Sequence, residues 1–153
     1  MKKQSLYLAL FGMVALTACE KEERITGDPT PAVSQAPQIT LGSMPTSYEE
    51  FDDITLYVNY TDGDGDIGFA NADSSVVYVT DNRDDIQFAF HVPPLSPDGE
   101  EVIIQGTLEV VVENVVLLNQ SGTSETTTFT VELVDRAGNW SNSATSPEIT
   151  INP

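Results

Sequence analysis

The chain has 153 residues, with 24 acidic and 6 basic side chains, a formal net charge of −18 at pH 7, and one cysteine. This length is sufficient for one domain of ordinary size. So acidic a chain offers no basic surface to neutralise phosphates, which excludes nucleic acid as a partner.

Residues 1–18 are predicted to form a secretory signal peptide. Lys2 and Lys3 give a positive start, and the apolar run LYLALFGMVAL extends from Leu6 to Leu16. This run is too short to cross about 30 Å of hydrocarbon as a helix. We therefore expect it to direct export and then to be removed.

The sequence that follows predicts lipidation. Leu16-Thr17-Ala18-Cys19 closes the apolar run and resembles the lipobox of bacterial lipoproteins. The resemblance implies that Cys19 carries the lipid and becomes the first residue of the mature protein. We expect an anchor in the cell outer membrane, with exposure on the cell surface left open. No free thiol then remains for a disulfide.

Residues 19–37 are predicted to be the lipidated cysteine and a flexible tether. The segment after Cys19 is polar, contains three prolines and has no helical or strand period, as expected for a linker. Its start, Glu20-Lys21-Glu22-Glu23, resembles the acidic export signals of surface lipoproteins in the Bacteroidetes group.

Residues 38–153 are predicted to form an all-β domain. Apolar and polar residues alternate with a period of two, as a half-buried strand requires. We expect strands in Ile54–Tyr60, Val76–Thr80, Ile86–Phe90, Thr107–Leu118 with a phase shift at Asn114, Thr128–Leu133, and around Ile149 and Ile151. Turn-forming clusters separate these runs. The pattern predicts an immunoglobulin- or fibronectin-like antiparallel β-sandwich of about seven strands.

The segment YTDGDGDIGF, residues 60–69, carries the strongest chemical signal. Asp62, Asp64 and Asp66 alternate with glycines, which allow a tight bend that brings the carboxylates together. Calcium takes six to eight oxygen ligands in a flexible arrangement and would remove the repulsion between these charges. An EF-hand is disfavoured, because Ile67 replaces its central glycine and Asp73 its bidentate glutamate.

A second segment, VDRAGNWSN over residues 134–142, is expected to complete this site. In a sandwich of the expected topology, the loop before the last strand lies at the same end as the acidic loop. Asp135 and Asn139 would then face the three aspartates as further calcium ligands. The alternative is that both segments are simple turns, since Asp-Gly and Gly-Asn pairs form turns without an ion.

Together the DGDGDIG and DRAGN motifs resemble those of poorly characterised Bacteroidetes lipoproteins and of bacterial immunoglobulin-like domains. The resemblance covers about residues 38–152. It implies a β-sandwich at the cell envelope, but no activity.

Catalytic residues are few. His91 is the only histidine, and no serine occurs in a G-x-S-x-G turn, so we expect no enzyme. Tyr57 and Trp140 are candidate ligand-binding residues, because exposed rings could stack on sugars. The sequence therefore predicts a lipid-anchored, calcium-binding interaction module with an unidentified protein or glycan partner. The alternative is an accessory lipoprotein that binds or processes carbohydrate.

Overall fold

The computed structural model describes residues 33–97 and 99–153. The predicted signal peptide, the predicted lipidation site Cys19 and most of the expected tether therefore lie outside the described residues. The described part is built from strands, which confirms the all-β class. It contains no helix long and apolar enough to cross a bilayer.

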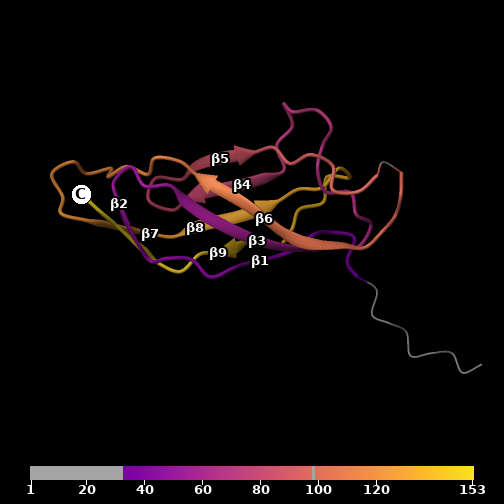
Figure 1. Ribbon diagram of the computed structural model, residues 1–153, viewed down its shortest axis with the longest axis horizontal. Helices are drawn as coiled ribbons and strands as arrows, with labels where there is room; N and C mark the ends of the chain where they lie inside the picture. Colours follow the sequence, from indigo (N-terminus) through magenta and orange to yellow (C-terminus); the bar gives the residue numbers. More distant parts are fainter. Residues whose placement is uncertain (1–32, 98) are drawn as a thin grey trace, which may run out of the picture. The chain divides into compact units, whose positions relative to one another are not determined.

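Ten strands form three sheets (Figure 1). They are β1 (Gln38–Leu41), β2 (Ser47–Glu49), β3 (Ile54–Asp62), β4 (Val77–Asp81), β5 (Ile86–Phe90), β6 (Ile104–Val112), β7 (Glu125–Thr127), β8 (Phe129–Leu133), β9 (Ala144–Thr145) and β10 (Ile149–Asn152). The strand orders are β1-β3-β6, β2-β10-β7 and β5-β4-β8-β9.

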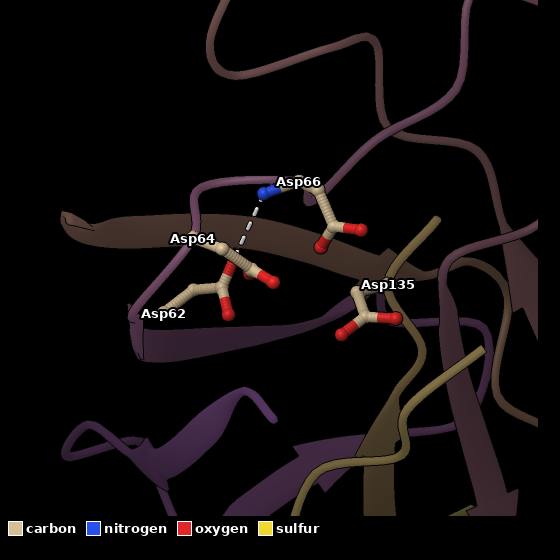
Figure 2. Close-up of side chains that lie close together, drawn as sticks. All are labelled: Asp62, Asp64, Asp66 and Asp135. Carbon is tan, nitrogen blue, oxygen red and sulfur yellow. Dashed lines mark hydrogen bonds between the residues drawn. The ribbon is translucent and has the colours of Figure 1, made fainter. Parts of the chain in front are cut away.

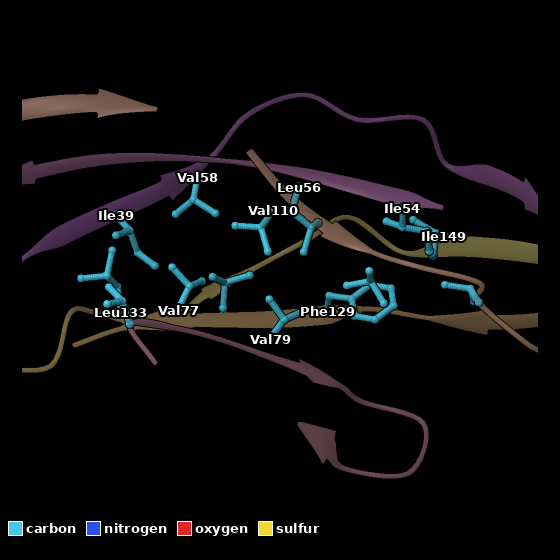
Figure 3. Packing of buried hydrophobic residues seen from close by; sticks show 14 of the residues in the cluster. Ile39, Ile54, Leu56, Val58, Val77, Val79, Val110, Phe129, Leu133 and Ile149 are labelled. Atoms are coloured by element: carbon cyan, nitrogen blue, oxygen red, sulfur yellow. The ribbon is translucent and has the colours of Figure 1, made fainter. Parts of the chain in front are cut away.

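The core lies between the β1-β3-β6 sheet and the β5-β4-β8-β9 sheet. The alternation in β3 turns Leu56 and Val58 inward and leaves Tyr57 exposed. Val79 and Phe129 face them from the other sheet (Figure 3). Burying each such side chain contributes about 1.5–3 kcal/mol, so this alternation is the main reason for the two-layer packing.

The number and direction of strands differ in part from the sequence prediction of about seven antiparallel strands. Three of the ten strands, β2, β7 and β9, have only two or three residues. One pair, β2 and β10, runs parallel. Parallel pairing needs a long connection rather than a hairpin, and these two strands come from opposite ends of the domain.

The run Thr107–Leu118 is not one continuous strand. β6 ends at Val112, and Asn114 has a φ of 53°, which turns the chain. Val110 and Val112 are buried before the turn, and Val115 and Leu117 are buried after it. The buried positions change from even to odd numbers, which confirms the phase shift expected at Asn114.

Candidate metal centre

Asp62 is the last residue of β3 and continues the inward-facing series of Ile54, Leu56 and Val58. Its side chain therefore enters the space between the layers, and the residue is 0% exposed. A carboxylate so placed loses its hydration, which is costly unless a partner compensates for it.

The loop after β3 brings two more carboxylates back over Asp62. Gly65 adopts a φ of 76°, a conformation that a glycine takes without strain. The backbone N–H of Asp66 donates to Oδ2 of Asp62 at 3.0 Å. Figure 2 shows this bond and the side chains of Asp62, Asp64 and Asp66 turned toward a common space.

Asp135 reaches the same space from the opposite layer, just after β8, and is 1% exposed. Asn139 holds it, donating from its backbone N–H to Oδ1 at 2.7 Å and from Nδ2 to Oδ2 at 2.9 Å. The same turn holds Asp66, whose Oδ2 accepts from the N–H of Ala137 at 2.9 Å. The backbone carbonyl of Asp66 accepts from the N–H of Arg136 at 3.1 Å. The two loops are thus fixed to each other before any ion binds.

Asp62, Asp64, Asp66 and Asp135 form the acidic cluster. Each offers one carboxylate oxygen, and these four oxygens all lie within 4.8 Å of one another. The Oδ1 atoms of Asp62, Asp64 and Asp66 are buried and accept no hydrogen bond. Buried polar atoms in proteins nearly always have a partner. The cluster could therefore hold a metal ion.

The electrostatics of the cluster agree with this. Burial, followed by the charge of Asp64, raises the pKa of Asp62 to about 6. Burial and the charges of Asp135 and Asp64 also raise the pKa of Asp66. In both cases the protein disfavours the ionised carboxylate. A bound cation would reverse that preference by neutralising the charges.

The sequence interpretation missed the residues that anchor this loop. Ile67 is fully buried, and its carbonyl accepts from the N–H of Leu95 at 3.1 Å. Ser96 donates from its hydroxyl to the carbonyl of Gly65, and the N–H of Val102 donates to the carbonyl of Asp64 at 3.3 Å. One isoleucine among aspartates and glycines is a signal for such an anchor.

Three further residues predicted from the sequence, Asn139, Trp140 and Tyr57, are not members of the acidic cluster. The side-chain amide of Asn139 points its nitrogen at Asp135 and positions that carboxylate. Trp140 is 51% exposed, and its ring centroid lies 5.2 Å from that of Tyr78. Tyr57 is exposed on the outer face of the other layer. The structure therefore does not bring Tyr57 and Trp140 together into one aromatic surface.

We expect Gly65→Ala to destabilise the protein by about 2 kcal/mol or more. A Cβ at this position would lie 2.3 Å from the carbonyl oxygen of Val102, and the φ of 76° strains any other residue. Gly99→Ala is the matched control, because Gly99 has a φ of 81° but no atom within 4 Å of its added Cβ. Urea unfolding of both variants gives the comparison. Equal losses would show that the close approach to Val102 is unimportant.

No protein-family model matches the chain, and comparison with curated proteins finds no match. Among solved structures, the SrpA adhesin from Streptococcus sanguinis, in a point-mutant form, aligns with 16% identity and a TM-score of 0.34. The alignment covers 78% of this chain and 58% of that chain. This chain thus spans less than two thirds of the adhesin structure. A structural similarity this low does not indicate a function.

Proposed function

We propose that this chain is a non-enzymatic, lipid-anchored module of the bacterial cell envelope, stabilised by calcium in the acidic cluster. The observation that carries the proposal is the convergence of four aspartates with three buried, unpartnered oxygens. The cluster offers only carboxylate oxygens, which suit calcium, whereas zinc prefers nitrogen and sulfur ligands. Two oxygens on opposite sides of a calcium ion are about 5 Å apart, a separation compatible with this cluster.

The ion would join the two layers at one end of the domain. Asp62 belongs to the β1-β3-β6 sheet, and Asp135 follows a strand of the other sheet. A ligand that binds only the folded state adds its binding free energy to stability. Calcium would therefore stabilise the loops at this end, which would present a rigid surface to a partner.

The first described residues meet the domain beside the same site. A Cβ on Gly63 would lie 2.5 Å from the carbonyl oxygen of Ser34, so the two backbones are in direct contact. Pro37, the last residue of the expected tether, is buried. If Cys19 carries the lipid, as the sequence predicts, the calcium site belongs to the end of the domain that the anchor enters.

Isothermal titration calorimetry with calcium tests this proposal. We expect the wild type to bind, and Asp64→Asn to weaken binding at least tenfold, because one charged ligand of four becomes neutral. Asp73→Asn is the matched control, since Asp73 is an exposed residue of the same loop that is not part of the acidic cluster. A wild type that gives no heat and no thermal shift with calcium would overturn the proposal.

A glycan-binding function has weaker support. It requires aromatic rings on a shared surface, and Tyr57 and Trp140 occupy the outer faces of different layers. The Tyr78–Trp140 pair alone is a small platform. Calcium binding with an unidentified partner is therefore the function that the geometry supports best.

A further inference from the structure

The two sheets of the sandwich meet at two lateral sides, and these sides differ. One side is closed by a residue that bonds to the edge strand, and the other side, between β5 and β6, has no such cover among the described residues. On the closed side, Asn142 pairs with the edge strand β1 in place of a strand. Its Oδ1 accepts from the N–H of Ile39 at 2.8 Å, and its Nδ2 donates to the carbonyl of Ile39 at 2.9 Å. Ile39 is consequently only 2% exposed.

On the open side, between β5 and β6, inward-facing side chains are incompletely covered. Phe88 and Phe90 pair directly with Val79 and Val77, which are fully buried. Residues directly opposite in an antiparallel pair face the same side of the sheet. Phe88, Phe90 and, from β6, Leu108 therefore point between the layers, yet all three remain partly exposed.

These side chains line a groove of about 750 Å³ between the two edge strands. A second hollow of about 190 Å³ shares Phe88, Val112 and Glu113 with it. The second hollow continues to Ile86, Val116 and Leu118, all exposed apolar residues. Together they form one channel, the β5–β6 groove, which is lined mainly by apolar residues and, in its second part, also by Asp81, Arg83 and Asp84.

The strands on either side of the groove also have free backbone edges. Within the described residues, β5 pairs only with β4, and β6 pairs only with β3. An exposed sheet edge above an apolar groove is the arrangement to which an extended peptide adds as a further strand. The peptide backbone bonds to the edge, and alternate side chains enter the groove.

Charge determines the kind of peptide. Glu109 alternates with inward-facing residues on β6, so it faces outward beside the free edge of that strand, and Glu113 follows the strand. The outward-facing side chains of an added strand would lie next to these carboxylates. Arg83 and Arg136 are the only lysine or arginine residues in the described ranges, and both already have partners. His91 also lines the groove, and its Nδ1 lies 2.9 Å from a backbone carbonyl oxygen. A second copy of this chain would bring further glutamates against Glu109 and Glu113. We propose that the β5–β6 groove binds an extended partner segment in which apolar residues alternate with lysine or arginine.

The test uses the full chain and a nine-residue peptide, with blocked ends, in which valine and lysine alternate. The control peptide has the same composition, with its valines and lysines in two separate blocks. Fluorescence anisotropy should show the alternating peptide binding at least tenfold more tightly. Hydrogen exchange should slow in residues 86–90 and 104–112 when this peptide binds. Equal affinity for both peptides, or slowing elsewhere, would overturn the proposal.

Two double variants separate the groove from general charge attraction. Glu109→Lys with Glu113→Lys should weaken binding at least tenfold. Glu101→Lys with Glu148→Lys makes the same charge change at exposed residues that do not line the groove and should weaken binding less than threefold. Equal weakening would contradict the groove as the site, and so would a chain that dimerises with β5 and β6 protected. Peptide binding should persist in EDTA, because the groove does not include the acidic cluster. A failure of the peptide proposal is therefore distinguishable from a failure of the calcium proposal.

Discussion

Asp62→Asn is expected to stabilise the metal-free protein at pH 8 by up to about 3 kcal/mol and to remove most of the stabilisation by calcium. Asp62 is 0% exposed, and its pKa is raised to about 6, first by burial and then by Asp64. At pH 8 the metal-free wild type must ionise a carboxylate that the fold prefers to keep neutral. An asparagine avoids that cost and can still accept the bond from the N–H of Asp66.

The direction of the pH dependence follows from the same pKa. In the unfolded chain Asp62 titrates near 3.8, and in the metal-free fold it titrates near 6. Its stabilising contribution is therefore complete below about pH 4 and is lost as the pH rises through 6. Calcium has the opposite dependence, because it competes with protons for Asp62 and Asp66. Calcium affinity should fall as the pH drops below 6.

Urea unfolding at pH 5 and pH 8, with EDTA or with calcium, measures both effects. The quantity to compare is the difference in unfolding free energy between Asp62→Asn and the wild type, because carboxylates outside the acidic cluster titrate alike in both. Asp73→Asn should leave all four values nearly unchanged. A metal-free Asp62→Asn variant less stable than the wild type at pH 8 would show that repulsion within the cluster is not the dominant effect.

The sequence revealed those parts of the fold and site whose signals are local. Period-two alternation located β3, β5 and β8, because each turns apolar side chains to one face along its own length, although β5 buries that face only in part. The spacing of Asp62, Asp64 and Asp66 likewise lies within one loop. Asp135 required a topological argument, and the structure places it in the cluster. The reason is that the turn after β8 folds onto the loop after β3.

Features that depend on distant partners left no such signal. β2 has three residues and exists because it pairs with β10, about a hundred residues later. Asn142 closes one side of the sandwich by bonding to Ile39, and nothing near it in the sequence indicates that role. The open β5–β6 groove is equally invisible, because it depends on which strands lack a neighbour. Local sequence patterns therefore specify individual strands, whereas the edges of the sheets depend on which strands pair across the whole chain.

Arg83→Met is expected to destabilise the protein by about 3–5 kcal/mol, because it leaves the buried Asp81 and the partly buried Glu125 without their cation. Nη2 of Arg83 lies 2.6 Å from Oδ2 of Asp81, and Nη1 lies 2.8 Å from Oε2 of Glu125. Nη1 also donates to the carbonyl of Val116 at 2.9 Å. One guanidinium thus joins the β4–β5 hairpin to β7 and to the segment after β6, both more than thirty residues later in the sequence.

The position of Asp81 makes the loss large. Burial alone would raise the pKa of Asp81, but hydrogen bonds from Arg83 and Thr127 outweigh it and hold that pKa below its ordinary value. Asp81 therefore contributes stability that is present above about pH 4 and lost as the pH falls through its folded-state pKa. Without Arg83 the burial cost dominates, so the difference between variant and wild type should shrink toward pH 3.

Urea unfolding at pH 7 and pH 3.5 tests this, with two further variants. Arg83→Lys keeps the charge but loses the planar fork that spans Asp81 and Glu125, so an intermediate loss is expected. Adding Asp81→Asn to Arg83→Met should cost much less than Asp81→Asn costs alone, because the stranded charge is then removed. Additive losses in that double variant would mean that the two residues act independently, and the ion network would not be what fastens the hairpin to β7.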